Sequence, residues 1–216
     1  MSTLKSKYSP YPDNNLDLKS AVIAFDAGIR WHIIPINVMN KYPIIYDKIN
    51  DESNKDIDVS ITRCPYSGTV VIYEGIFTVD GKNKNNITLK KDDYIVQQIN
   101  GECITGKCLI RRWEGYVMTL KDVLHELTDC EYLDYKKDDV DNDISNTSKQ
   151  IVGLSYDSSD IDKGVKYIAL ISNDFNKIKE YISKYNIKMT KKNTFMIPTN
   201  LETWLDFYPN SKQIEI

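Results

Sequence analysis

Residues 57–73 read IDVSITRCPYSGTVVIY, two strand-like runs on either side of a turn signal. The runs 57–62 and 69–73 are rich in β-branched residues, which favour strands. Between them, Pro65 fixes the φ that the first central position of a type I turn needs, and Gly68 stands where the chain must recover. The stretch therefore predicts a hairpin connection that begins immediately after Cys64.

Similar strand-like runs recur on both sides of this stretch, with turn signals between them. Glu74-Gly75 and Asp80-Gly81 predict tight turns, the second more strongly because Gly after Asp tolerates positive φ. The Trp-Glu-Gly sequence at 113–115 predicts a further hairpin between runs 109–112 and 116–118. The remaining runs are 20–25, 76–79, 94–99, 151–156, 165–171 and 194–197.

Three segments predict short helices. Thr119 and Asp122 resemble a capping box, Asn173 can cap a second helix, and Thr199 with Glu202 forms a capping-box pair for a third. The apolar stripes of these helices are Leu120, Val123, Leu124 and Leu127; Phe175, Ile178, Ile182 and Tyr185; and Leu201, Trp204 and Leu205. Strands in the majority, with about three short peripheral helices, predict an α+β fold with mostly antiparallel or barrel-like sheets.

The length of 216 residues favours one large domain over two small ones. Residues 1–19 are polar and contain two prolines, which predicts an irregular N-terminal arm. Residues 20–135 are expected to form the main β-rich unit, and the acidic segment 136–150 predicts a flexible loop. The segment 151–216 is short for an independent domain, so we expect this α/β segment to complete the same fold.

The composition excludes several classes of protein. Hydrophobic residues make up 41% and charged residues 27%, which is typical of a globular chain. A formal net charge of −3 gives no reason to expect nucleic acid or an anionic membrane as partner. No apolar run has the length of a membrane span, and residues 1–15 lack the apolar region of a signal peptide. Four cysteines without such a signal predict free thiols and a cytoplasmic protein.

The residue bias suggests a source. Ile, Asn, Lys, Asp and Tyr are abundant, whereas Ala, Gly and Pro are scarce. The favoured residues have AT-rich codons, which indicates an AT-rich genome such as that of a giant DNA virus or a protist. A component of a virion or another assembly, located in the host cytoplasm or the virion, is therefore one functional hypothesis.

Four motifs in order resemble those of one protein family. Residues 22–26 (VIAFD) and 35–47 (PINVMNKYPIIYD) match an opening strand and the pattern P-L-x-x-L-N-x-H-E-I-V-N-D. Residues 59–68 (VSITRCPYSG) match P-V-x-V-T-Y-C-P-L-x-G, and 98–106 (QINGECITG) match Q-x-x-G-E-A-I-x-G. The family's closing T-W-x-x-W motif has echoes at 119–133 and 203–211. From about residue 21 to 133 the chain is therefore similar to the uncharacterised prokaryotic family called domain of unknown function three-one-seven-nine.

The departures from this family concern its polar residues. Tyr42 and Pro43 stand at the family's His-Glu pair, and Tyr46 stands at its Asn. Only Asp47 of that cluster is kept. The resemblance therefore implies a divergent member that has lost the family's candidate acid–base or metal-binding groups.

The best candidate for chemistry is Cys64. A thiol at the end of a strand, close to Arg63 and with Asp47 and Ser67 in support, could form a reactive thiolate. The alternative is a buried thiol in a structural turn. We favour the turn, because no histidine lies nearby in sequence to act as a base, and Val70 occupies the position that a phosphate-loop arginine would need.

Other candidate sites give weaker signals. Cys103, Cys108, Cys130 and His125 could supply zinc ligands, but they lack the paired C-x-x-C spacing of zinc motifs. The helix that begins at Thr119 is expected to place His125 in solvent, and His32 is expected to be packed or at a strand edge. Residues 139–143 resemble the start of a calcium loop, without its required Gly and Glu. No cofactor or metal is expected.

The hypothesis that follows is a non-catalytic binding or structural module, whose partner is an unspecified protein or small molecule. The first alternative is a thiol-dependent enzyme or redox protein that uses Cys64. The second is the virion or assembly component, for which a homo-oligomer is the expected form.

Overall fold

The structure, a computed structural model, describes most of the chain. The described residues are 3–13, 16–50, 55–64, 67–75, 97–99, 102–104, 112–113, 115–140, 150–155, 167–172, 174–185, 187 and 195–216. They form three mixed sheets, a small ribbon of β8 (Gln97–Ile99) and β9 (Glu102–Ile104), and four short helices, so the predicted strand-rich α+β class is confirmed. Their strands form no closed barrel. The predicted run 76–79 and the turn at Asp80-Gly81 lie outside the described residues.

The first sheet contains the predicted hairpin around Cys64. Its strand order is β1-β5-β6-β7-β10, and β6 and β7 are antiparallel, with Val59 opposite Glu74 and Arg63 opposite Val70. β5 is antiparallel to β6, and β1 is parallel to β5. The strands are β1 (Thr3–Lys5), β5 (Ile44–Asn50), β6 (Asp56–Arg63), β7 (Val70–Glu74) and β10 (Arg112–Trp113).

The second sheet has the order β11-β3-β4-β12-β2. β3 and β4 form a hairpin, β12 is parallel to β4, and β2 is antiparallel to β12. The strands are β2 (Tyr8–Ser9), β3 (Ala21–Asp26), β4 (Trp31–Pro35), β11 (Gly115–Thr119) and β12 (Cys130–Leu133). The N-terminal arm, expected to be irregular, therefore supplies edge strands to both sheets. Its polar side chains concealed this, because an edge strand is held by backbone hydrogen bonds.

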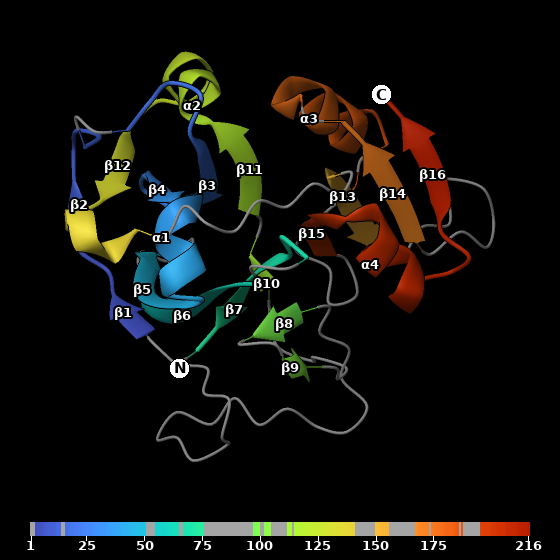
Figure 1. Cartoon of the computed structure of the whole chain (residues 1–216). Coiled ribbons are helices and arrows are strands. Elements are labelled where there is room, and N and C mark those ends of the chain that lie inside the picture. Colours follow the sequence, from blue (N-terminus) through green and yellow to red (C-terminus); the bar gives the residue numbers. More distant parts are fainter. Residues whose placement is uncertain are drawn as a thin grey trace.

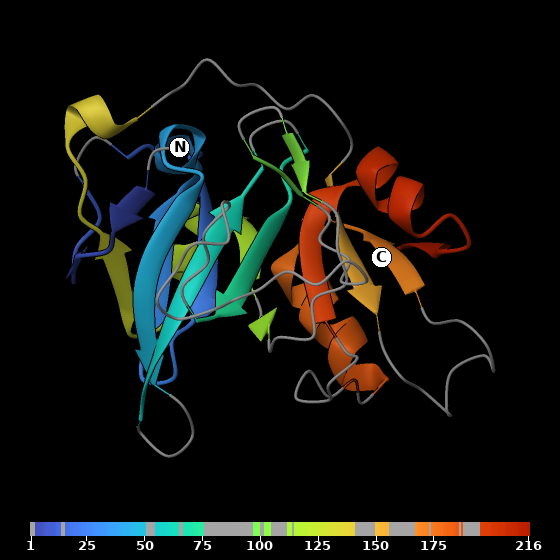
Figure 2. The same cartoon turned by 90° about the horizontal axis from the view of Figure 1, so that it is seen from below.

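These two sheets face each other across an apolar core (Figure 1; Figure 2). Ile23, Phe25 and Ile34 come from the second sheet, and Ile45, Ile49, Val59, Ile61, Val70 and Ile72 come from the first. The chain passes from one sheet to the other at both edges, between β1 and β2 and between β10 and β11. The predicted hairpin across 113–115 is therefore wrong, since β10 pairs with β7 and β11 pairs with β3.

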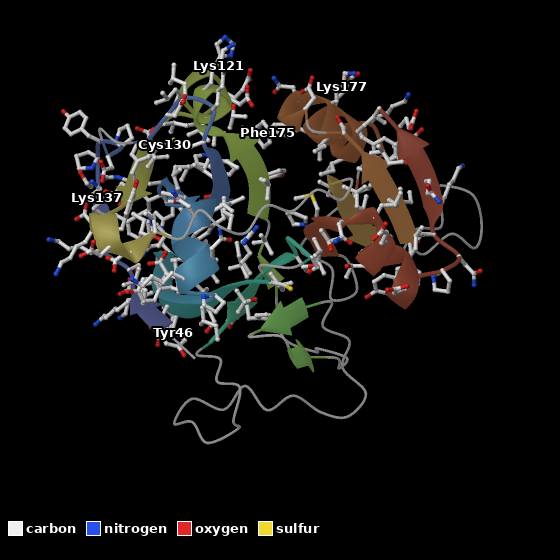
Figure 3. All side chains as sticks on the ribbon, in the orientation of Figure 1. Tyr46, Lys121, Cys130, Lys137, Phe175 and Lys177 are labelled. Carbon is white, nitrogen blue, oxygen red and sulfur yellow. The ribbon has the colours of Figure 1, made fainter. Side chains whose placement is uncertain are left out.

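The third sheet has the order β15-β13-β14-β16. It packs against residues on the outer faces of the other two sheets. Its strands are β13 (Gln150–Ser155), β14 (Tyr167–Ile171), β15 (Phe195–Asn200) and β16 (Lys212–Glu215). With helix α3 (Phe175–Lys184) it packs on the second sheet, where the Phe175 ring meets Tyr116 edge to face at 4.6 Å (Figure 3). With helix α4 (Leu201–Phe207) it packs on Ile44, Val71 and Tyr73 of the first sheet.

Three helices lie where the sequence predicts them, and two of them have caps one residue away from the predicted position. Helix α2 (Leu120–Glu126) begins at Thr119, whose hydroxyl accepts the Asp122 N–H as predicted. Helix α3 is capped by Asp174, not Asn173, and α4 by Asn200, not Thr199. The predicted apolar stripes are confirmed except for Leu124, which is 50% exposed.

Helix α1 (Ile36–Lys41) is not among the predicted elements; it follows Pro35 and buries Val38 and Met39. In the acidic segment expected to be a loop, a short 3-10 helix spans Lys137–Asp139, and residues 141–149 lie outside the described part of the chain.

Candidate functional site

Cys64 lies in a packed turn. It follows β6 and has 0% exposure. Its backbone N–H donates to the Thr69 carbonyl, and its own carbonyl accepts the Gly68 N–H, each at 2.9 Å. Gly68 has a φ of +70°, in the left-handed region that favours glycine. The Sγ atom accepts the Ser67 N–H at 3.3 Å, so the sulfur is enclosed by its own turn.

A row of buried hydroxyls joins this turn to the third sheet. Ser67 Oγ lies 2.7 Å from Thr69 Oγ1, which lies 2.6 Å from Thr199 Oγ1 at the end of β15. The Asn200 N–H also donates to the Ser67 carbonyl at 3.1 Å. These groups satisfy one another where no water reaches them, which is how buried polar groups are normally accommodated. The turn after β6 in the first sheet is therefore hydrogen-bonded to β15 of the third sheet.

The residues predicted to support Cys64 are not all beside it. Arg63 is buried and contacts the Asn40 side-chain oxygen, and burial lowers the pKa of its guanidinium to about 10. Asp47 lies opposite Val59, five residues before Cys64 along β6. That spacing corresponds to roughly 16 Å of strand. The predicted set is therefore divided between two places.

Asp47 belongs to a second polar group, between the first and second sheets. On β5, Ile45 and Ile49 point into the core between the sheets, and Asp47 lies between them on the same face. On β4, Ile34 points into this core, and His32 precedes it by two residues. The two polar side chains meet there, with His32 Nδ1 2.8 Å from Asp47 Oδ2.

The N-terminal arm completes the partners of Asp47. The Tyr8 hydroxyl donates to Oδ2 at 2.6 Å, and the Ser6 hydroxyl donates to Oδ1 at 2.7 Å. The backbone N–H of Lys48 also donates to Oδ1 at 2.7 Å. The carboxylate therefore binds β4, β5 and the arm together.

Electrostatics agree with an ionised Asp47. Burial alone would raise the pKa of this carboxyl group, but hydrogen bonds and charge from His32, and hydrogen bonds from Tyr8 and Ser6, lower it below its usual value. The pKa of the Tyr8 hydroxyl is raised well above its usual value, first by burial and then by the charge of Asp47. The Tyr8 hydroxyl therefore stays protonated and remains a hydrogen-bond donor to Asp47.

The cluster of polar side chains around Asp47 extends to the protein surface through Glu131 and Arg30. His32 Nε2 lies 3.7 Å from Glu131 Oε2, and the Arg30 guanidinium contacts the other Glu131 oxygen. The His32 ring lies 4.0 Å from the Tyr8 ring and 5.4 Å from the Phe25 ring, measured between centroids. Side-chain exposure rises from 11% at His32 to 25% at Glu131 and 53% at Arg30.

Both ring nitrogens of His32 face carboxylates of the fold. A histidine that acts as general base receives support from a carboxylate at one nitrogen and presents the other to a nucleophile or substrate. His32 has Asp47 at one nitrogen and a second carboxylate, Glu131, on the side of the other. Its partners are thus the parts of the fold that it connects.

The sequence alone does not pair His32 with Asp47. A signal was present, because the alternation Ile45-x-Asp47-x-Ile49 places a charge on a buried strand face, and such a charge needs a partner. The sequence does not identify that partner, since β4 and β5 lie in different sheets and are not paired strands.

The weak metal candidates are dispersed or outside the described residues. His125 is exposed on α2, as predicted, and pairs with Glu126, whereas Cys130 is half-buried on β12 (Figure 3). Cys103 lies on β9, and Cys108 lies outside the described residues. Within the described part of the chain, no three His, Cys, Asp or Glu side chains are grouped as metal ligands.

Two open hollows of about 560 Å³ each lie on the described surface. One, next to the N-terminal arm, is lined by Ser9, Tyr11, Pro12, Asp13, Leu133, Asp134 and Tyr135. The other, between α2 and α3, is lined by Asp122, Glu126, Ser172, Asp174, Phe175, Asn176 and Ile216. Neither hollow includes Cys64, His32 or Asp47.

Comparison with protein-family models, curated proteins and solved structures gives no match to this chain. The resemblance noted in residues 21–133 therefore stays a prediction from its motifs. Among the described helices, none has the length and apolarity needed to cross a membrane.

Proposed function

We propose that this protein is a non-catalytic binding or structural module. The observation that carries the proposal is the enclosure of the Cys64 sulfur at 0% exposure, in a turn that joins two sheets. A nucleophilic thiol needs access to its substrate and an environment that favours thiolate. The Cys64 sulfur instead accepts the Ser67 N–H within its turn, and the backbone of Cys64 bonds to Thr69 and Gly68.

The His32–Asp47 pair supports the same proposal. Its carboxylate holds the N-terminal arm, and its imidazole packs between Tyr8 and Phe25. A cytoplasmic location is proposed with it, on the basis of Cys64 and Cys130, which are free thiols.

Thiol labelling tests the proposal. Native protein is treated with iodoacetamide over a range of pH, and the Cys64 peptide is quantified by mass spectrometry. We expect Cys64 to react at least about a hundredfold more slowly in native protein than in protein unfolded in guanidinium, because reaction requires local opening.

The same peptide in unfolded protein is the matched control for intrinsic reactivity. Labelling of native Cys64 below pH 8 at the rate of the unfolded chain would contradict the proposal and favour the thiol-dependent enzyme.

A further inference from the structure

The hollow beside the N-terminal arm has the size of a ligand site. It lies where the residues after β2 and after β12 come together, and its volume is about 560 Å³. Binding sites for ligands commonly measure roughly 300–1,000 Å³. Because it is open, the hollow suits a side chain presented by another molecule.

Two tyrosine rings line this hollow. Tyr11, at 77% exposure, is the most exposed large hydrophobic residue in the described chain. Tyr135 is half-buried, and burial, followed by the charge of Asp13, raises the pKa of its hydroxyl to about 12. The phenol of Tyr135 is therefore neutral at physiological pH, and the electron-rich face of a neutral tyrosine attracts cations.

Two carboxylates, Asp13 and Asp134, line the same hollow, and among the described residues of its lining there is no lysine or arginine. Lys7 Nζ lies 3.9 Å from Asp134 Oδ2, with side-chain exposures of 84% and 42%. Such an exposed ion pair is weak, so a better-placed cation can replace Lys7.

We propose that this hollow binds an arginine or lysine side chain of a protein partner. The inference rests on the proposed binding function and names the chemistry of its ligand. The cation would lie against Tyr11 and Tyr135 and pair with Asp134, in place of Lys7. Aromatic rings combined with carboxylates are the usual means of recognising organic cations.

The second hollow is acidic too, but its aromatic ring is buried, whereas Tyr11 in the arm hollow is exposed. Asp122 and Asp174 bind backbone or hydroxyl groups at helix starts, and Glu126 pairs with His125 at 2.7 Å. Its aromatic ring, Phe175, is 6% exposed and has Lys179 over it at 5.0 Å. The arm hollow is therefore the better cation site.

Nuclear magnetic resonance titration tests the inference. ¹⁵N-labelled full-length protein is titrated with Nα-acetylarginine amide, and separately with Nα-acetylcitrulline amide, a nearly isosteric uncharged probe. We expect the arginine probe to shift the backbone amide signals of Tyr11, Asp13, Asp134 and Tyr135. The citrulline probe should shift them much less.

Substitutions at exposed residues measure how much each side chain contributes to binding of the arginine probe. Tyr11→Ala and Asp134→Asn should each weaken arginine binding about two- to fivefold, and Tyr11→Trp should preserve or strengthen it. Lys7→Met should tighten binding, because the internal competitor for Asp134 is removed. Glu180→Gln, with the same charge change on an exposed face of α3, is the matched control and should leave the affinity unchanged.

Equal shifts from both probes, or a loss of affinity in Glu180→Gln as large as in Asp134→Asn, would overturn the inference. Shifts confined to another surface would overturn this location and leave the proposed binding function standing. Rapid labelling of native Cys64 would instead contradict the proposed function, whatever the titration shows.

Discussion

At the scale of single residues, Asp47 stands out as a charge on an otherwise apolar strand face. It is 7% exposed, and three side chains from β4 and the arm share its two oxygens. A buried carboxylate is costly unless its partners are well placed, and removal of one member of such a group leaves the others unsatisfied. Asp47 is therefore the residue whose change should most affect the contact between the two sheets.

Asp47→Asn should lower the free energy of unfolding by about 3 kcal/mol at neutral pH, measured by urea denaturation. The variant should also lose part of the acid sensitivity of the protein. The pKa of Asp47 is lowered in the folded state, so its stabilising contribution is complete above the unfolded value of about 3.9 and is lost as pH falls through the folded value.

Asp56→Asn is the control for this change, because Asp56 is exposed and pairs with Lys48 at 3.8 Å. It should cost at most about 1 kcal/mol. Equal losses in the two variants, or an unchanged acid limb in Asp47→Asn, would contradict the assigned role of Asp47.

The two candidate sites differ in how much the sequence could predict. The turn around Cys64 was predictable because Pro65 and Gly68 act locally through their own backbone preferences. The His32–Asp47 contact joins two sheets, and the Tyr8 contact comes from a polar arm without strand signals. Such contacts depend on how distant segments pack, which local propensity does not encode.

At the scale of elements, β13 and α4 are fitted closely around Gly153. A Cβ atom at this position would lie 2.1 Å from Trp204 Cε3 and 2.3 Å from Cζ3, so the indole rests directly on the strand backbone. Trp204 is itself 0% exposed, and its Nε1–H donates to Ser211 Oγ at 2.8 Å. The position of α4 therefore depends on the missing side chain of Gly153.

Gly153→Ala should destabilise the protein by about 3 kcal/mol, because a rigid ring on a packed helix cannot move aside cheaply. Trp204→Ala should cost about 3–5 kcal/mol. In the double variant the costs should be less than additive, since the clash is gone once the indole is removed. Full additivity in urea denaturation would mean that Trp204 does not cover Gly153.

Elements with strong local signals were predicted well, and those set by distant pairing were not. Helices α2, α3 and α4 carry caps and apolar stripes, so α2 begins as predicted and the caps of α3 and α4 differ from the prediction by one residue. The segment 112–119 reads as a hairpin because its turn residues are local, yet its two strands pair with β7 and β3 in different sheets. Helix α1 is only six residues long and has no polar N-cap to announce it.

At the scale of the molecule, the third sheet shares its apolar clusters with the other two. Val152, Leu154 and Phe175 pack with Val22 and Tyr116, while residues of α4 pack with Tyr73. The third sheet cannot separate from the other two sheets without exposing apolar core residues to water. We therefore expect one cooperative unit, in agreement with the single domain predicted from the sequence.

Amide hydrogen exchange should show whether the three sheets unfold as one cooperative unit. Core amides of β4 and β14 should exchange through an opening of the same free energy. Phe175→Leu, on α3, should lower that value in both strands by about 1 kcal/mol. If β14 alone loses protection, the third sheet unfolds independently and the single-unit expectation is wrong.

The strand pairing of the N-terminal arm also constrains the order in which segments can fold during synthesis. Thr3–Lys5 needs the strand that begins at Ile44, and Tyr8 needs Leu133. Residues 3–9 leave the ribosome before their partner strands, so they must wait, unpaired, until residue 133 has been made. The segment that contains Thr3–Lys5 and Tyr8 is thus among the last to be secured.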